Sequence, residues 1–315
     1  MVMVRLSSDS RMLDHAPPIG HPESPERLAT VIRHLERTSL RDACPSGTVR
    51  EATDEELFRV HDVGYVDSLS RFESVGGGRI ESDTWLGPGS LLAARLAAGA
   101  AIEAVSAVID GPQKVAFCAV RPPGHHARPA AAMGFCLFGT VAAAASHAIE
   151  SRGLGRVLVV DWDVHHGNGT QEMFYADGRV AFLSLHRHPF YPGTGMKDET
   201  GTGRGLGWTR NLPTSYGTPR REILDRFVSE LNELADVTRP ELVLISAGFD
   251  AHANDPVGDL GLETEDFETL THAVQEVADT HAGGRIVSVL EGGYHPATLS
   301  QCVEAHLRAL GADTP

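Results

Sequence analysis

Short runs of consecutive apolar residues alternate along this chain with helical patterns, and this alternation is the strongest constraint on its fold. Apolar side chains on successive positions, bounded by Gly, Pro or polar turn residues, are typical of strands covered on both faces. The runs span 115–120, 156–161, 180–186, 242–249 and 286–291. Between them, apolar residues recur at i, i+3 and i+4 over 223–235, where Thr218 and Pro219 are expected to cap and begin a helix. Thr264 is the expected cap of another helix.

This alternation predicts an α/β protein with one open parallel sheet and helices on both sides. No linker rich in Ser, Gly or Pro divides the chain, and there is no internal repeat, so we expect a single domain over 1–315. The Gly-rich stretches at 76–78 and 200–205 lack the strand and helix context of a nucleotide-binding loop.

Composition excludes some classes of protein. Lys and Arg number 27 against 42 Asp and Glu, and the formal charge of −15 argues against direct binding of nucleic acid. Arg95 and Glu103 interrupt the apolar segment 91–109, which we expect to be too polar to span a membrane. The N-terminus has no signal-peptide pattern, and four widely separated Cys predict buried thiols. We therefore expect a cytoplasmic protein, whose oligomeric state the sequence leaves open.

Ionisable side chains follow several of the predicted strands, at the edge where open α/β sheets bind ligands. Asp161, Asp163 and His165 alternate with a period of two, so they point to one side while the chain stays extended. Burial of three such groups is costly unless a cation gathers them. Asp250 follows the run at 242–249. Asp163, His165 and Asp250 thus predict a two-Asp, one-His metal site with an open position, as in catalytic centres.

Two further strand ends carry groups of catalytic type. His125 and His126 follow the run at 115–120 behind a Pro-Pro-Gly turn, and Tyr294 follows a Gly-Gly pair after the run at 286–291. Each group alone is more typical of an ordinary loop. Together with the Asp and His residues above, they indicate a catalytic site.

Several long motifs resemble those of the histone deacetylase superfamily, in particular its class II and bacterial amidohydrolase branches. The motifs are Arg121-Pro-Pro-Gly-His-His-Ala127, Gly134-Phe-Cys136, Asp161-Trp-Asp-Val-His-His-Gly-Asn-Gly-Thr-Gln171, Tyr191-Pro-Gly-Thr-Gly195, Ser246-Ala-Gly-Phe-Asp250 and Glu291-Gly-Gly-Tyr294. The resemblance runs from about His15 to Tyr294. It implies the arginase-deacetylase fold, with a central parallel sheet of about eight strands. It also implies a zinc-dependent deacetylase.

The resemblance implies the metal ligands already selected, Asp163, His165 and Asp250. Zinc is the implied metal, and a two-Asp, one-His site also suits Fe²⁺ or Co²⁺. An arginase-type manganese pair would need further Asp ligands after Asp250, where the chain continues Ala-His-Ala. This argues against a binuclear manganese hydrolase.

The resemblance also implies the acid–base groups. It places Asp161 beside His125, which favours a charged imidazolium, and Asn168 beside His126, which leaves that ring neutral. His126 is therefore the expected general base, with His125 acting mainly by electrostatics. Tyr294 is the expected hydrogen-bond donor to the developing oxyanion.

Substrate contacts follow from the same resemblance. The Gly134 carbonyl matches the acceptor for the substrate amide N–H, and Phe135 and Tyr191 match the aromatic walls of an acyl-lysine tunnel. Tyr191 replaces the commoner Phe, with an effect on substrates that the sequence leaves open. Glu81 and Asp83 are candidates for holding a peptide backbone, although a solvated loop explains them as well.

Weaker assignments concern monovalent cations, K⁺ or Na⁺, with a structural role. The resemblance implies an inner site at Asp161, Asp163, His165, Ser184 and Leu185, and an outer site at Phe174, Asp177, Val180 and Trp208. Ordinary strand packing also explains Ser184 and Leu185.

These observations predict a zinc-dependent deacetylase acting on an acylated lysine peptide. A deacylase of acetylpolyamines or other small N-acyl amines would share every catalytic residue. Val257 stands where polyamine-selective members carry an acidic residue, so that form of selectivity is not supported. A catalytically silent acyl-lysine binding protein would lack a ligand, a dyad His or the Tyr, and all are present here.

Overall fold

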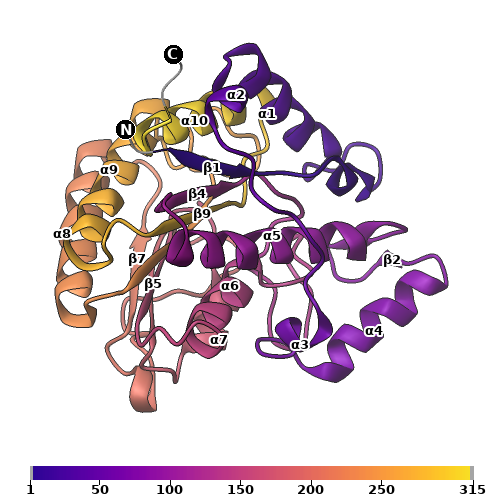
Figure 1. Cartoon of the computed structure of the whole chain (residues 1–315), viewed down its shortest axis with the longest axis horizontal. Coiled ribbons are helices and arrows are strands. Elements are labelled where there is room, and N and C mark those ends of the chain that lie inside the picture. The colour runs from indigo at the N-terminus through magenta and orange to yellow at the C-terminus, as the bar shows by residue number, and fades with distance from the viewer. Residues whose placement is uncertain (1–2, 313–315) are drawn as a thin grey trace.

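The computed structural model describes residues 3–312, which form a seven-stranded parallel sheet between two layers of helices (Figure 1). The strands lie in the order β1-β4-β9-β8-β5-β6-β7. Their bounds are β1 Val4–Ser7, β4 Val115–Cys118, β5 Val157–Asp161, β6 Val180–Arg187, β7 Thr209–Thr214, β8 Leu242–Ala247 and β9 Ile286–Leu290. A separate antiparallel pair joins β2 (Gly78–Arg79) to β3 (Trp85–Leu86). The predicted α/β class and parallel sheet are confirmed, with one strand fewer than expected among the described residues.

Helices cover both faces of the sheet. One layer contains α1 (Pro25–Arg37), α8 (Arg220–Thr238), α9 (Thr264–His281) and α10 (Pro296–Ala309), which contact one another in the order α1-α10-α9-α8. The other contains α5 (Ser90–Asp110), α6 (Thr140–Glu150) and α7 (Asn168–Phe174), seen in front of the sheet in Figure 1. The shorter elements are η1 (Ser10–Asp14), α2 (Leu40–Ala43), α3 (Asp54–Leu57), α4 (Val63–Ser74) and η2 (Gly203–Gly205).

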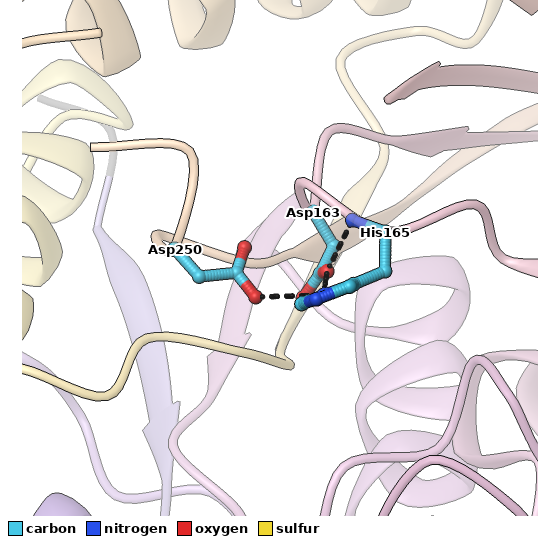
Figure 2. A group of neighbouring side chains, drawn as sticks. All are labelled: Asp163, His165 and Asp250. Carbon is cyan, nitrogen blue, oxygen red and sulfur yellow. Dashed lines mark hydrogen bonds and ion pairs between the residues drawn. The ribbon is translucent and has the colours of Figure 1, made fainter. Parts of the chain in front are cut away.

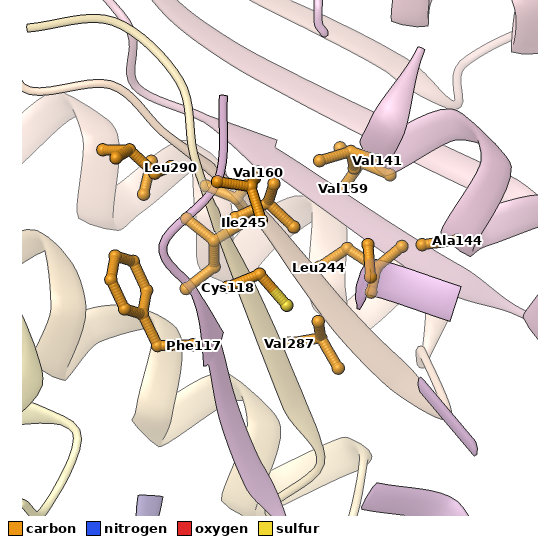
Figure 3. Close-up of a cluster of buried hydrophobic side chains, with 14 of the residues drawn as sticks. Phe117, Cys118, Val141, Ala144, Val159, Val160, Leu244, Ile245, Val287 and Leu290 are labelled. Carbon is orange, nitrogen blue, oxygen red and sulfur yellow. The ribbon is translucent and has the colours of Figure 1, made fainter. Parts of the chain in front are cut away.

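The apolar core lies between the central strands and these layers. Figure 3 shows Val141 and Ala144 of α6 on the face of the sheet that carries Val159 of β5 and Leu244 of β8, whereas Phe117 of β4 points to the opposite face, toward His306 of α10. Every residue of β4, β5, β8 and β9 is buried, which explains why they read as continuous apolar runs rather than alternating patterns. All four Cys are free and buried, as predicted.

The two edge strands were not predicted. β1 has four residues, and β7 contains Arg210, Asn211 and Pro213, a composition that favours a loop. Both strands form because each pairs in parallel register with one apolar neighbour, β4 or β6. Edge strands therefore depend on the existing sheet rather than on their own pattern.

Both predicted helix caps were wrong by one residue or more. Pro219 is extended and precedes α8, and the Thr218 hydroxyl donates to the Ser215 carbonyl instead of capping the helix. At α9, Glu263 is the cap, and it exchanges hydrogen bonds with Asp266 in a capping box. The Glu263 backbone is extended, so the helix begins at Thr264 itself.

We expected the apolar segment 91–109 to be too polar to span a membrane, and helix α5 corrects that reasoning. By length and composition alone, Ser90–Asp110 is long and apolar enough to cross a membrane. In the structure, 67% of the most apolar 18-residue stretch of this helix is buried inside the protein. It therefore packs as a core helix, which explains its many Ala residues.

Candidate active site

The predicted site residues lie at the carboxyl ends of the central strands, where the chain reverses its direction across the sheet. From β5 the chain moves outward to β6 and β7, and β8 then returns to the other side of β5. Open α/β sheets bind ligands at such a switch point, because the loops after the two strands diverge there. Asp161 at the end of β5 is in register with Ser246 of β8. The loops after both strands therefore start side by side.

Asp163, His165 and Asp250 meet in this crevice, as Figure 2 shows. The His165 Nδ1 atom lies 2.9 Å from Asp163 Oδ1 and 3.2 Å from Asp250 Oδ2. All three side chains are buried, and one ligand atom of each lies within 4.8 Å of the others. The structure thus brings together the three residues that the sequence selected.

The charge balance of this cluster fits a divalent cation. Burial, together with the neighbouring Asp163 carboxylate, raises the pKa of Asp250 to about 7. Asp250 Oδ1 accepts from the Val164 N–H at 2.8 Å, whereas the buried Oδ2 makes no hydrogen bond among the described residues and has His165 Nδ1 as a neighbour at 3.2 Å. Oxygen and imidazole donors with a surplus of negative charge suit zinc, Fe²⁺ or Co²⁺. The residues present therefore fit the implied metal.

Gly292 allows the backbone to approach both carboxylates. A Cβ atom there would lie 2.2 Å from Asp250 Oδ2 and 2.4 Å from Asp163 Oδ2, too close for any side chain. The Gly292 N–H donates to Asp163 Oδ2 at 2.8 Å. The glycine after β9 thus holds one ligand and leaves the space beside both of them open.

The two adjacent histidines have different partners, as the resemblance implied. His125 Nδ1 donates to Asp161 Oδ2 at 2.9 Å, and His126 Nδ1 donates to the Asn168 amide oxygen at 2.7 Å. Burial alone would lower the pKa of His125, but the Asp163 and Asp161 carboxylates raise it well above its usual value. Burial, together with the neighbouring His125 and His165, holds the pKa of His126 well below its usual value. His126 is thus a neutral ring whose Nε2 is free to accept a proton.

A cavity of about 230 Å³ leads to this cluster. It is lined by Asp83, His126, Gly134, Phe135, His165, Phe190, Tyr191, Val257 and Tyr294. The Tyr191 ring stands edge-on to His126 at 5.2 Å between centroids, and Phe135 stands edge-on to Tyr294 at 5.7 Å. The predicted aromatic walls therefore face one cavity, with His126 and Tyr294 in its lining.

Gly134 and Phe135, which line this cavity, both have a backbone conformation with positive φ. Gly134 has a φ of +56°, and a Cβ there would lie 2.2 Å from the His126 ring. Phe135 also has a positive φ, +68°, which is strained for a residue with a side chain. The Thr84 hydroxyl accepts from the Phe135 N–H at 3.0 Å and helps to hold this conformation.

Sequence reasoning missed several residues of the site. Phe190 stacks on the metal-ligand candidate His165 at 5.3 Å, and its position next to Tyr191 was the available signal. The Glu291 carboxylate accepts from the Gly124 and His125 N–H groups at 2.6 and 3.2 Å, so it holds the dyad loop. Nothing local in the sequence indicates that bond, because 166 residues or more separate the partners.

A second buried cluster was also missed. The Glu23 carboxylate lies 2.7 Å from Arg121, 3.2 Å from Arg27 and 3.3 Å from His15. The Arg27 guanidinium also lies over the Tyr294 ring at 4.8 Å and donates to the Gly293 carbonyl at 2.6 Å. Burial raises the pKa of Tyr294 well above its usual value, so its hydroxyl keeps its proton.

The remaining predicted residues are placed as follows. Asp83 lines the cavity, whereas the Glu81 carboxylate accepts from the Ser82 hydroxyl and from the Asp83 N–H. Ser184 is in register with Asp161, and its hydroxyl bonds to His186 at 3.0 Å. The proposed outer cation residues include Asp177, whose carboxylate is paired with Arg179 at 2.7 Å. Backbone bonds link Phe174 to Asp177, Asp177 to Val180, and Trp208 to Phe182.

A parallel sheet with a buried carboxylate–histidine centre at its switch point is the arrangement of an α/β protein with a candidate metal-binding site. The family model for the histone deacetylase domain matches residues 21–310, and the chain belongs to the histone deacetylase family. It is 39% identical to a histone deacetylase-like amidohydrolase from Pseudomonas aeruginosa, over 90% of this chain and 75% of that protein. It is also 40% identical to the human polyamine deacetylase HDAC10, over 92% of this chain and 45% of that protein.

A solved structure supports the same assignment. The crystal structure of the HDA15 HD domain is similar to this chain with a TM-score of 0.92 and 37% sequence identity. The match covers 98% of this chain and 88% of the HDA15 chain. The central sheet and its helical layers are therefore those of a histone deacetylase, and the family supports a deacetylase activity.

Proposed function

We propose that this protein is a zinc-dependent deacetylase that hydrolyses N-acetyl or short N-acyl amides, with an acyl-lysine side chain as its substrate. The observation that carries the proposal is the buried Asp163–His165–Asp250 cluster, in which Asp250 Oδ2 makes no hydrogen bond among the described residues. His165 of this cluster lines the same cavity as the neutral His126 and Tyr294. Fe²⁺ and Co²⁺ fit the same donors.

In this proposal Asp163, His165 and Asp250 hold the metal ion. When bound, the ion supplies Lewis acidity, which polarises the acyl carbonyl and lowers the pKa of water. His126 accepts a proton from the attacking water at Nε2 and later donates it to the departing amine. His125 stays charged beside Asp161 and stabilises negative charge by electrostatics.

The cavity lining positions the substrate. The Gly134 carbonyl accepts the substrate amide N–H, and Phe135 and Tyr191 flank the alkyl chain of the lysine. Tyr294 donates its hydroxyl to the oxyanion that develops on the carbonyl oxygen, and its raised pKa keeps the donor protonated. Asp83 at the cavity is placed to accept backbone N–H groups of a peptide.

Two further parts of the proposal concern ions and substrate range. K⁺ or Na⁺ would bind with a structural role near Ser184 and Leu185, and near the carbonyls of Phe174, Asp177, Val180 and Trp208. Val257, an apolar residue, lines the cavity at the position where polyamine selectivity would call for a carboxylate. This observation favours acyl-lysine over acetylated polyamines.

The test combines metal content with turnover on an acetyl-lysine peptide and on an acetylated polyamine. We expect one bound metal per chain, turnover of the peptide, and a loss of about a hundredfold or more in kcat for Tyr294→Phe. Tyr216→Phe, which changes an exposed tyrosine, is the matched control and should leave kcat unchanged. Turnover of the polyamine alone would select the polyamine deacetylase. Metal-loaded protein that turns over neither substrate would overturn the proposal.

A further inference from the structure

The loop after β8 contains a buried carboxylate, Asp255, that the mechanism above does not use. Its Oδ1 atom accepts from the N–H groups of Val257 and Gly258 at 2.9 and 3.0 Å. Its Oδ2 atom accepts from the Tyr294 N–H at 2.6 Å. No Lys or Arg among residues 3–312 forms an ion pair with it. The charge of Asp255 is therefore stabilised by three backbone donors from two separate loops.

The two loops carry different parts of the cavity. Val257 lines the cavity, and Gly258 packs so closely on Asp250 that a Cβ there would lie 2.1 Å from the Asp250 carbonyl oxygen. Tyr294 belongs to the loop after β9 and lines the same cavity. Asp255 thus joins the loop that follows one metal-ligand candidate to the loop that bears the oxyanion donor.

The geometry of a local turn explains two of these three bonds. The bonds to Val257 and Gly258 close a turn within the Asp255 loop, as Asp side chains often do. The bond to Tyr294 spans 39 residues and adds nothing to that turn. It is also the shortest of the three, as expected for a charge-assisted hydrogen bond that is buried.

The two glycines that precede Tyr294 do little to hold its backbone in place, so other contacts must do so. Gly292 and Gly293 leave the backbone free, and Gly293 has a φ of +124°, which side chains rarely allow. Arg27 donates to the Gly293 carbonyl and lies over the Tyr294 ring. Because that carbonyl shares one planar peptide group with the Tyr294 N–H, Arg27 and Asp255 hold the same peptide from opposite ends. A hydroxyl that must meet a developing oxyanion tolerates little displacement, and a misplacement of about 1 Å can cost about a hundredfold in rate.

We propose that Asp255 is a positioning residue, which sets the Tyr294 hydroxyl through its hydrogen bond to the Tyr294 backbone and couples it to the Val257 side of the cavity. The inference rests on the proposed role of Tyr294 in deacetylation. Asp255 itself touches neither substrate nor metal in this account. In this proposal its main effect on catalysis passes through Tyr294.

The test is a double-mutant cycle on the metal-loaded protein with Asp255→Asn and Tyr294→Phe. The Asn amide keeps one acceptor oxygen and turns the other atom into a donor, so it cannot satisfy both loops. We expect Asp255→Asn to lower kcat by about tenfold to a hundredfold, with little change in KM and one metal still bound. In the Tyr294→Phe background, the same change should cost less than about twofold, because the two residues act as one unit.

A matched control is Asp266→Asn, which alters another buried Asp that accepts a backbone N–H, at the start of α9. It should lower stability and leave kcat unchanged. Asp255→Glu is a second variant, since it keeps the charge but shifts the acceptor oxygens. If Asp255→Asn does not fold, Asp255→Glu should show the same dependence on Tyr294 with a smaller loss.

The outcomes separate the two proposals. If Tyr294→Phe lowers kcat but Asp255→Asn does not, the inference about Asp255 is overturned and the proposed function stands. If Asp255→Asn costs the same factor in both backgrounds, its role is general support of the site, and the inference is again overturned. A silent Tyr294→Phe would overturn the proposed function and this inference with it.

Discussion

Glu23 and Asp250 are both fully buried carboxylates, yet their surroundings carry opposite charge. Glu23 lies among Arg121, Arg27 and His15, whereas Asp250 shares a single histidine, His165, with a second carboxylate. Burial would raise the pKa of Glu23, but Arg121 and its other partners hold it well below its usual value. For Asp250, burial and the neighbouring Asp163 act together and raise the pKa to about 7.

The difference distinguishes a structural ion-pair cluster from a candidate binding site. The Glu23 cluster is complete within the chain, because Arg121 also donates to the carbonyls of Met12 and His15 and so ties the N-terminal segment to the loop after β4. The Asp163–His165–Asp250 cluster has two carboxylates to one histidine, and its Asp250 Oδ2 atom makes no hydrogen bond among the described residues. Its negative charge is compensated only in part within the chain, and binding of a cation would complete the compensation.

The largest expected effect is the loss of activity when the Asp163–His165–Asp250 cluster is broken. Asp163→Asn should lower kcat by about a thousandfold or more, because the Lewis acidity contributes several kcal/mol to the reaction. Metal content should fall to near zero, and the metal-free protein should lose stability, because the Asp163 carboxylate accepts from the Gly292 N–H and is the counter-charge of His125 and His165. Assay of activity, elemental analysis and denaturant unfolding measure the three quantities. Equal metal content in both proteins would contradict this prediction.

The second-largest effect is expected on stability, when the Glu23 cluster is broken. Glu23→Gln should lower the free energy of unfolding by about 3–5 kcal/mol, because two buried guanidinium groups lose their counter-charge. Glu26→Gln is the control three residues further along, in the first turn of α1, where an exposed pair with Arg33 should contribute less than about 1 kcal/mol. Urea unfolding of both metal-free variants provides the comparison. A similarly small loss of unfolding free energy in both variants would show that the buried Glu23 cluster does not stabilise the fold.

A third prediction concerns acid. Burial lowers the pKa of His61 to about 4 from its usual 6.5, and its Nε2 accepts from the Gly139 N–H. The unfolded chain therefore binds a proton before the folded one, so stability is present above pH 6.5 and is lost as pH falls toward 4. The loss is at most about 3 kcal/mol.

Unfolding of wild type and His61→Gln across this pH range tests that prediction. The slope of stability against pH should be shallower in the variant. The loss caused by Glu23→Gln should stay constant down to about pH 5.5 and shrink toward pH 4, because Glu23 binds a proton near its usual pKa of 4.5 in the unfolded chain but not in the folded one. Parallel slopes for wild type and His61→Gln would show that His61 does not contribute to acid sensitivity.

The smallest effect is expected at Tyr191, whose hydroxyl is buried without a hydrogen-bond partner among the described residues. Tyr191→Phe should leave stability unchanged or raise it by up to about 1 kcal/mol, because an unsatisfied polar group is removed. Tyr65→Phe is the contrasting control, since the Tyr65 hydroxyl donates to the Leu137 carbonyl at 2.7 Å and its loss should destabilise the protein by about 1 kcal/mol. Thermal unfolding distinguishes the two, and equal losses would contradict the prediction.

The sequence predicted those parts of the site that follow from local order along the chain. Asp163 and His165 are two positions apart after one strand, and Asp250 follows a neighbouring strand by the same logic of strand ends. Phe190 was missed because only the turn of its loop brings its ring onto His165. Edge strand β7 was missed because its polar residues and Pro213 look like a loop until β6 supplies the hydrogen bonds.

The sequence by itself determined the α/β class, because continuous apolar runs between amphipathic helices have few other ways to be buried. It also determined which residue types stand at the strand ends. Only the tertiary structure decided how their charges are compensated. Glu23 meets Arg121 across 98 residues, and Asp255 reaches Tyr294 across 39. Such pairings depend on the order of strands in the sheet, and the energy of a buried charge depends on every group around it, whatever its distance along the chain.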